Sequence, residues 1–274
     1  MRMNLIIAGG LLLLACSNGP QPAVGLVPNG PTPPARKLVW ADEFDKPGLP
    51  DSTKWRYDVG GHGWGNNELQ FYTANRAENA RVESGRLIIE ARKEAYQGRN
   101  YTSARLLTQQ TATWTYGRFE AMAKLPKGRG TWPAVWMLGK TIAGAGWPRC
   151  GEIDIMEHVG FDEGTVHGSI HSEAYNHVKG TQKTGKKTVA DVTGSFHLYA
   201  VDWTPDRIDF LIDQQVYYSV TRSALGSSEA QWPFNQPFFL LLNVAVGGNW
   251  GGQQGVDETI WPQRMEVDYV RVYQ

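Results

Sequence analysis

Most of the chain from residue 37 onward carries the hydrophobic pattern of β-strands. In residues 117–125 the apolar side chains fall on every second position, and mostly polar or charged side chains stand between them. Residues 207–213 alternate in the same way. A period of two is typical of a strand that has one buried face. We therefore expect strands in both segments, with these side chains facing the core: Phe119, Ala121, Ala123, Leu125, Ile208, Phe210 and Ile212.

Two segments near the C-terminal end extend this pattern. Residues 238–246 form a continuous apolar run, which predicts a strand covered on both sides, and residues 267–273 predict a closing strand. No stretch keeps a helical period over three turns, and Gly, Pro, Asn and Asp interrupt the chain throughout. The fold class that we expect is all-β, a two-sheet antiparallel β-sandwich.

The first residues of the chain are patterned differently. Arg2 precedes a short uncharged apolar run that is too short to span a membrane, and this predicts a signal peptide over residues 1–15. The run ends in Leu-Leu-Ala-Cys, which resembles a bacterial lipoprotein signal in which Cys16 is lipidated. We expect an exported protein that is anchored to a membrane through Cys16, at the cell surface or in the periplasm. Plain secretion is the alternative.

A tether separates this signal from the folded part of the chain. Residues 17–36 contain six Pro and three Gly with almost no charge. Such a segment cannot bury enough apolar surface to fold, and it predicts a semi-extended disordered tether over residues 16–36. The remaining residues, 37–274, have the length of one all-β domain.

The amino-acid composition limits the kinds of molecule that this protein could bind. Lys plus Arg and Asp plus Glu both number 27, so the net charge is zero, which argues against electrostatic binding of nucleic acid. The 11 Trp and 31 Gly suit a β-protein with flat aromatic surfaces for a neutral ligand. The two cysteines are Cys16 and Cys150, and Cys16 belongs to the export signal, so we expect no intrachain disulfide.

The most informative segment is residues 151–158, GEIDIMEH, an apolar strand that carries three acids. Glu152 and Asp154 are two positions apart and therefore face the same way. Glu157 is five positions from Glu152, so a regular strand would point it into the other layer. A β-bulge at Ile155–Met156 would add one residue and return Glu157 to the acidic face.

This spacing fits the hydrolysis of a glycosidic bond. With the bulge, the two glutamates lie four strand steps apart, roughly 13 Å between Cα atoms. Side chains that lean inward bring the carboxylates to about 5 Å, as in retaining glycosidases, against roughly 6.5–9.5 Å in inverting ones. Like charges this close raise at least one pKa, which keeps one acid protonated near neutral pH. A solvated acidic strand face and a calcium site are the alternatives at this point.

The flanking motifs add a resemblance to a known family. The chain resembles glycoside hydrolase family 16 and, within it, the bacterial laminarinases, which are endo-β-1,3-glucanases. The resemblance spans about residues 38–274 and rests on these motifs: WADEF (40–44), GWGNNE (63–68), GRFEA (117–121), GRGTWPAVWM (128–137), GWPRCGEIDIMEH (146–158), GGNWGG (247–252) and VDYVRVY (267–273).

The resemblance implies a concanavalin-like jelly roll with a long open cleft and catalysis without a cofactor. Glu152 resembles the nucleophile, Asp154 the residue that orients and tunes it, and Glu157 the acid/base. The substrate contacts that the family implies are Asn66, Arg105, Trp132, Trp136 and His171. Some relatives bind a structural calcium, for which the matching positions are Asp268 and backbone oxygens near Glu43 and Gly85.

The sequence context divides the tryptophans into two groups. A tryptophan can stack on the apolar face of a sugar while polar groups bind its rim. Those in Gly- and Pro-rich stretches near the motifs are expected in the cleft, with core packing as the alternative: Trp132, Trp136, Trp147 and Trp250. The others are expected in the core: Trp40, Trp55, Trp203 and Trp232. Cys150 and His158 are interpreted as structural.

Two other functions stay open. A non-catalytic β-glucan-binding protein would keep the tryptophans and lose an acid, whereas all three acids are present. The same chemistry on mixed-linkage glucan, xyloglucan or a red-algal galactan is the second alternative. The E-x-D-x-x-E spacing argues against relatives with E-x-D-x-E, which favour mixed-linkage glucan and xyloglucan, and the neutral motifs suggest no sulfate pocket. We expect a monomer that acts on β-glucan polysaccharide.

Overall fold

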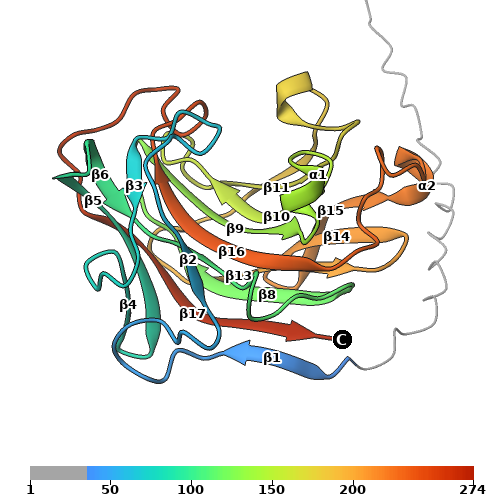
Figure 1. The fold of residues 1–274 in the computed structure, drawn as a ribbon, viewed down its shortest axis with the longest axis horizontal. Coiled ribbons are helices and arrows are strands. Elements are labelled where there is room, and N and C mark those ends of the chain that lie inside the picture. The colour runs from blue at the N-terminus through green and yellow to red at the C-terminus, as the bar shows by residue number, and fades with distance from the viewer. Residues whose placement is uncertain (1–35) are drawn as a thin grey trace, which may run out of the picture. The chain divides into compact units, whose positions relative to one another are not determined.

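The alternating segments form two β-sheets in a computed structural model of the chain. The structure describes residues 36–274, so the predicted signal peptide, Cys16 and nearly all of the tether lie outside the described residues and stay predictions. Figure 1 shows the sheets as two curved layers, with β9, β10 and β16 in one layer and β8 and β13 in the other. The predicted two-sheet antiparallel sandwich is therefore confirmed.

The larger sheet has ten strands. In spatial order they are β15 (Gln215–Thr221), β14 (Arg207–Ile212), β13 (His197–Trp203), β8 (Gly117–Lys124), β17 (Gln263–Tyr273), β5 (Arg86–Tyr96), β6 (Arg99–Ser103) and β3 (Gln70–Tyr72), with β1 (Leu38–Asp42) paired to β17 and β4 (Ala80–Glu83) paired to β5. The pairing of β3 with β6 is parallel, and the other pairings in this sheet are antiparallel.

The smaller sheet has seven antiparallel strands. Their order is β12 (Lys183–Thr188), β11 (Thr165–His171), β10 (Glu152–His158), β9 (Thr131–Gly139), β16 (Phe238–Val246), β7 (Arg105–Leu107) and β2 (Arg56–Asp58). Helices are short: α1 (Ile142–Ala145), α2 (Arg222–Leu225) and the 3-10 turn His177–Lys179. Within residues 36–274 no helix has the length and apolar character needed to cross a bilayer.

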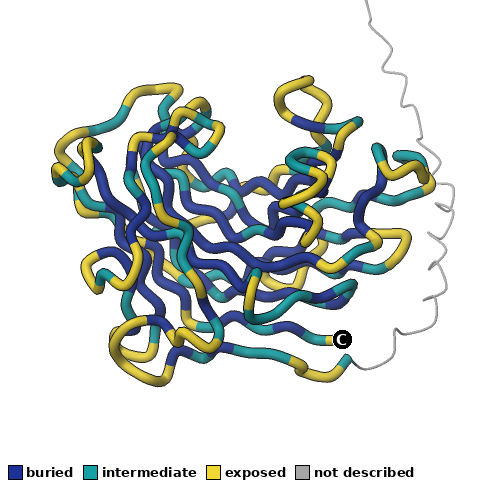
Figure 2. Tube along the Cα trace, in the orientation of Figure 1, coloured by how far each residue is buried: buried dark blue, intermediate teal, exposed yellow. Residues whose placement is uncertain are grey.

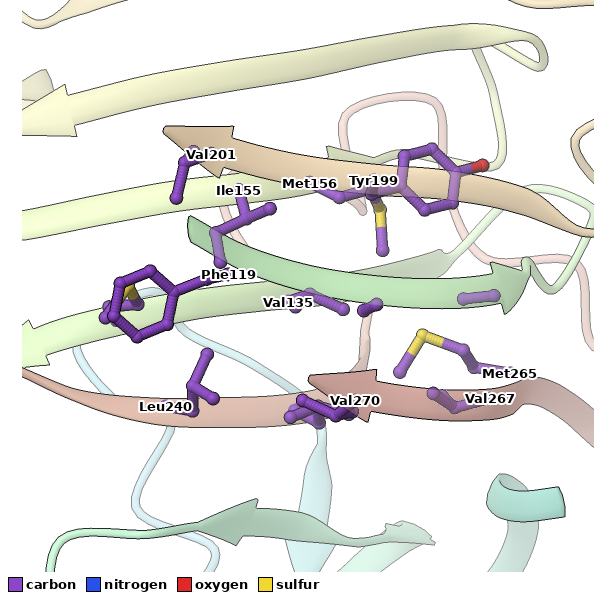
Figure 3. Packing of buried hydrophobic residues seen from close by; sticks show 14 of the residues in the cluster. Phe119, Val135, Ile155, Met156, Tyr199, Val201, Leu240, Met265, Val267 and Val270 are labelled. Atoms are coloured by element: carbon purple, nitrogen blue, oxygen red, sulfur yellow. The ribbon is translucent and has the colours of Figure 1, made fainter. Parts of the chain in front are cut away.

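The core lies between the two sheets. Buried stretches of chain follow the strands of both layers, whereas exposed stretches are concentrated in the loops (Figure 2). Figure 3 shows apolar side chains from the two sheets packed against one another, among them Phe119 of β8, Val135 of β9, Ile155 and Met156 of β10, and Val201 of β13. Burial of this apolar surface is the main stabilising contribution.

The predicted inward positions are confirmed. The apolar side chains predicted to face inward from residues 117–125 and 207–213 are all buried, and all nine residues of β16 are buried. Trp55, Trp203 and Trp232 are buried in the core, and Trp40 packs edge-on against Trp55. The core therefore covers one face of the seven-stranded sheet, and the other face is left to line a site.

Candidate active site

Strand β10 carries the predicted bulge. Asp154 is opposite Trp136 and Glu157 is opposite Ala134 on β9, so β10 advances by three residues while β9 advances by two. On the other side the same two acids are opposite Ser169 and His167 of β11, again three residues against two. The intervening Ile155 and Met156 are both buried in the core. The extra residue returns Glu157 to the face that carries Glu152 and Asp154.

These acids lie in a cleft of about 900 Å³ on the face of the seven-stranded sheet away from the core. Alternate residues of neighbouring strands form its floor, because side chains along a strand alternate between the two faces. The floor residues are Trp132, Ala134, Trp136 and Leu138 of β9, His167, Ser169 and His171 of β11, and Phe239, Leu241, Asn243 and Ala245 of β16.

Each glutamate accepts a hydrogen bond from an indole. The Nε1–H group of Trp147 donates to Glu152 Oε2 at 2.9 Å, and that of Trp132 donates to Glu157 Oε1 at 3.0 Å. A neutral donor favours the ionised form of a carboxylate without introducing a charge. The two contacts also fix the direction in which each carboxylate points.

The imidazole of His171 lies beside the carboxylates of Asp154 and Glu152. Its Nε2 atom is 3.2 Å from Asp154 Oδ2 and 3.7 Å from Glu152 Oε1. Asp154 and His171 are both buried. One imidazole nitrogen therefore lies close to two carboxylates.

Burial raises the pKa of all three acids. The pKa of Glu152 rises to about 8 because of burial and then the charge of Asp154. Burial raises the pKa of Glu157 to about 7, while His171 and the Trp132 hydrogen bond oppose the rise and the charge of Glu152 adds to it. The pKa of Asp154 lies well above its ordinary range, through burial and then the charge of Glu157. The cluster therefore holds at least one proton at neutral pH.

All the predicted substrate-contact residues line the same cleft: Asn66, Arg105, Trp132, Trp136, Trp147, His171 and Trp250. The guanidinium of Arg105 lies 4.6 Å from the ring centroid of Trp136. Trp250 packs edge-on against Trp132, with 5.5 Å between ring centroids. The structure brings these residues together in one cleft, as predicted.

Several residues that hold these contacts in place were not predicted from the sequence. Asp58 pairs with Arg105 at 2.9 Å, and the ring centroid of Trp64 lies 4.8 Å from the same guanidinium. Asn243 accepts the indole N–H of Trp136 at 2.8 Å. Trp64 lies in the GWGNNE motif, which could have identified it, whereas Asp58 and Asn243 stand in no motif.

At the other end of the cleft, His177 was also missed. Its ring lies 4.9 Å from that of Trp147 and 5.3 Å from that of His171, measured between centroids. Burial lowers the pKa of His177, and the neighbouring His171 lowers it further. The neutral form of His177 is therefore favoured beside the Trp147 platform.

The two residues interpreted as structural are buried. Burial raises the pKa of the Cys150 thiol to about 12, so it is not ionised at neutral pH. Burial lowers the pKa of His158 to about 4, and its Nε2 atom accepts the backbone N–H of Gly164 at 3.3 Å. Both are placed as the sequence interpretation requires.

The residues implied as calcium ligands come from β17 and from the turns after β1 and β4. Arg271 donates two hydrogen bonds of 2.8 Å to the carboxylate of Glu43, and the side chain of Asp268 is exposed. Calcium would therefore depend on one carboxylate and on backbone oxygens near Glu43 and Gly85, and it stays a prediction. Within residues 36–274, the single group of three or more acidic, His or Cys ligand atoms close enough to hold a metal ion is Glu152, Asp154 and His171, within 4.8 Å of one another.

Comparison with known proteins agrees with this geometry. The model of the glycosyl hydrolases family 16 matches residues 67–271. The chain is 59% identical over 245 residues to a β-glucanase from Rhodothermus marinus, covering 88% of this chain and 86% of that protein. It is 41% identical over 248 residues to a glucan endo-1,3-β-glucosidase from Cryptopygus antarcticus, covering 85% of this chain and 90% of that protein.

Similarity to a solved structure extends over the whole described fold. The X-ray structure of the laminarinase from Rhodothermus marinus superposes with a TM-score of 0.86 at 57% identity, covering 89% of this chain and 99% of that chain. The family indicated by the sequence motifs is thereby confirmed, and this chain belongs to glycoside hydrolase family 16.

Proposed function

We propose that this chain is an exported, retaining endo-β-1,3-glucanase of the laminarinase type. The observation that carries the proposal is the bulge in β10, which sets a buried aspartate and two partly buried glutamates side by side on the floor of an open, tryptophan-lined cleft. The similarity to proteins named β-glucanase and glucan endo-1,3-β-glucosidase supports β-1,3-glucan as the substrate.

In the first step Glu152 attacks the anomeric carbon and forms a glycosyl ester. Glu157 gives its proton to the departing glycosidic oxygen, so the glycosidic bond breaks as the ester bond forms. A pKa of about 7 suits Glu157 to this role, since the acid then holds its proton when substrate binds and can release it during the reaction. Glu152 must react as the carboxylate, and the N–H group of Trp147 stabilises that form.

Asp154 makes the ionisation of Glu152 possible. Its pKa lies well above the ordinary range, so it carries a proton of the cluster in the free enzyme. A protonated Asp154 bears no charge, so its contribution to the raised pKa of Glu152 is then absent, while the contribution of burial remains. His171 lies against both carboxylates and favours the ionised form of Glu152 as well.

In the second step Glu157 acts as a base and no longer as an acid. The carboxylate that remains after the first step takes a proton from water, and the water oxygen attacks the anomeric carbon of the ester. Glu152 leaves as a carboxylate. Two inversions at one carbon give a product with the β-configuration of the substrate.

The cleft supplies both kinds of contact that a glucan needs. Trp132, Trp136 and Trp250 offer flat apolar faces, while Asn66 and Arg105 offer polar groups for hydroxyls. The Arg105 guanidinium pairs with Asp58 and lies against the indoles of Trp64 and Trp136, so its orientation in the cleft is restrained. A cleft open along one face admits an internal segment of a long chain, which supports endo cleavage.

The export part of the proposal rests on sequence. The apolar run that ends at Cys16 and the Pro-rich segment after it support a lipid anchor with a tether. A domain held in this way reaches polysaccharide outside the membrane. Secretion without an anchor is the alternative outcome.

Substrate specificity is tested by incubating the protein with laminarin, lichenan, xyloglucan and agarose and sizing the products over time. We expect random internal cleavage of laminarin, with short oligosaccharides and glucose accumulating. Lichenan should be cut more slowly and only in segments that contain β-1,3 bonds. Agarose or xyloglucan as the best substrate would refute the proposed specificity.

The roles of the two glutamates are tested with an aryl glucoside oligomer that has a good leaving group. Glu152→Gln should abolish turnover of every substrate, because no ester forms. Glu157→Gln should lose about 10²–10⁴-fold on laminarin but keep the first step on the aryl substrate, giving a burst of aryl alcohol. Added azide should speed the later phase and yield a β-glycosyl azide. An α-azide, or rescue of Glu152→Gln alone, would show that the roles are reversed.

A further inference from the structure

A second bulge lies across the core from the catalytic one. In the pairing of β14 with β15, Phe210 is opposite Tyr218 and Leu211 is opposite Val216, so Tyr217 is the extra residue. The bulge allows two consecutive tyrosines, Tyr217 and Tyr218, to pack against the seven-stranded sheet, where a regular strand would turn one of them away.

Two paired glycines receive these tyrosines. Gly168 of β11 is directly opposite Gly185 of β12. A Cβ atom at Gly168 would overlap the hydroxyl oxygen of Tyr217, and one at Gly185 would overlap the Tyr218 ring. Any larger residue at either position would therefore displace a tyrosine.

The Tyr217 hydroxyl lies against Gly168, the β11 residue next to the bulge of the catalytic strand. On β11, Gly168 stands between Ser169, the partner of Asp154, and His167, the partner of Glu157. The part of β10 that faces Gly168 is therefore the extra residue at Ile155–Met156, where the ladder is locally interrupted. This interruption sets the spacing between Asp154 and Glu157.

The Tyr217 hydroxyl is a polar group in an apolar setting. It is buried and has no hydrogen-bond partner among residues 36–274. A buried hydroxyl without a partner costs about 1–3 kcal/mol; phenylalanine would avoid that cost but would lose the atom that contacts Gly168. Burial raises the pKa of the Tyr217 phenol, and the charges of Asp154 and Glu157 raise it further, so the hydroxyl and the two acids share one electrostatic environment.

We propose that Tyr217 is a positioning residue for the catalytic acids. Its hydroxyl, projecting from the ten-stranded sheet against Gly168, holds β11 in place beside the β10 bulge and thereby fixes the separation of Asp154 and Glu157. The inference rests on the roles proposed for those acids. It assigns Tyr217 no contact with substrate, since the residue lies on the core side of the sheet.

Other titratable groups lie around the catalytic acids and Tyr217, and the test must separate their effects from that of the Tyr217 hydroxyl. They come from the catalytic strand, from the cleft side of its neighbours and from the opposite sheet: Glu152, Asp154, His167, His171, Lys186 and Tyr199. None of them is altered by a substitution at Tyr217. A shift in the pH profile of a Tyr217 variant therefore reports on the hydroxyl.

The test is Tyr217→Phe in the full chain, with Tyr218→Phe as the matched control from the same bulge. We expect Tyr217→Phe to lower kcat on laminarin about tenfold with KM unchanged, because the acids are misplaced while the cleft is intact. A relaxed bulge also moves Glu157 away from Glu152, whose charge raises the pKa of Glu157, so the alkaline limb of the kcat profile should move down by about half a pH unit. Tyr218→Phe should leave both quantities at the wild-type value.

Thermal unfolding of the same variants completes the test. A lower Tm in Tyr217→Phe with an unchanged kcat and pH profile would reduce Tyr217 to a packing residue and overturn the proposal. Equal effects of Tyr217→Phe and Tyr218→Phe on the alkaline limb would overturn it as well. If Glu157→Gln proved fully active on laminarin, the proposed function would fail irrespective of the Tyr217 result, so the two failures are distinguishable.

Discussion

Trp147 and Glu152 are joined by an N–H···O hydrogen bond of 2.9 Å in which the indole is the donor. The same indole lies against His171, with 6.0 Å between ring centroids. Trp147 therefore contacts the proposed nucleophile through its edge and lines the cleft as well. Its hydrogen bond opposes the effect of burial, which raises the pKa of Glu152.

Replacing Trp147 by Phe should separate these two contributions. The ring that lines the cleft is largely kept, but the donor to Glu152 is lost. A hydrogen bond to a charged group contributes about 1.5–3 kcal/mol, so kcat should fall about 10–100-fold while KM changes little. The acid limb of the kcat profile should move to higher pH, because Glu152 then ionises less readily.

Trp136→Phe is the matched control for this prediction. Trp136 also lines the cleft, but its indole donates to Asn243 at 2.8 Å and to no acid. We expect its loss to raise KM without moving the acid limb. An acid limb that stays in place for Trp147→Phe would contradict the proposed effect of the indole on Glu152.

The raised pKa values of the acids predict how stability depends on pH. The pKa of Glu157 is 4.5 in its ordinary state and about 7 when folded, so the folded protein holds a proton that the unfolded chain releases. This contribution to stability is complete below about pH 4.5 and is lost as pH rises through about 7. The proton on Glu152 acts in the same direction up to about pH 8.

Calorimetric Tm values of the wild type and Glu157→Gln between pH 5 and pH 8 would measure this effect. The wild type should lose Tm relative to the variant as pH rises, because glutamine does not titrate. Buried His158 and His167 act with the opposite sign, since their pKa values are lowered to about 4, but they are present in both proteins and cancel. Parallel curves for the two proteins would contradict the raised pKa.

The bulge itself can be removed by deleting Met156. Glu157 would then follow Asp154 by two positions, which matches the register of Trp136 and Ala134 on β9 without an extra residue. We expect a folded but weakened enzyme, since the deletion also removes a buried core side chain (Figure 3). Loss of such a side chain costs about 2–5 kcal/mol.

Met156→Ala distinguishes the two consequences of this deletion. It leaves the bulge and shortens the core side chain, so it should lower the free energy of unfolding while keeping kcat near the wild-type value. Chemical denaturation and laminarin kinetics on both variants provide the comparison. If Met156→Ala lost as much kcat as the deletion, core packing rather than the bulge would control the spacing of the acids.

The anchoring of the chain is testable without reference to the fold. If Cys16 carries the lipid, Cys16→Ser should release the protein from membranes or block its processing. Detergent partitioning of the two forms measures this. Unchanged partitioning of Cys16→Ser would exclude lipidation, and Cys150→Ser is a control expected to leave partitioning unaltered.

Local patterns were sufficient to predict the strands and the acidic face. Alternation in residues 117–125 and 207–213 depends only on which side of a strand is buried, and the structure places those side chains inward. The bulge was also predictable, because three acids can share one face at this spacing only with an extra residue at Ile155–Met156. The tryptophans could be sorted by their Gly- and Pro-rich surroundings.

Contacts between distant strands left no such signal. Asp58 and Arg105 meet because β2 and β7 are neighbours in the folded sheet, and Asn243 reaches Trp136 because β16 lies beside β9. Strand order and register determine which of these side chains come into contact, and both depend on the whole chain. Tyr217 was missed for the same reason, since its significance comes from a glycine pair in the opposite sheet.

The bulge in β10 also changes which positions of that strand tolerate substitution. Along a regular strand, sensitivity to a polar replacement should recur at every second residue. Here the buried apolar positions are Ile153, Ile155 and Met156, and the next buried inward position is His158. In a saturation scan of residues 152–158, the alternation of sensitive and tolerant positions should therefore shift by one residue in the middle of the strand. A comparison that sorts the positions only as odd or even would assign Glu157 to the wrong side of the sheet.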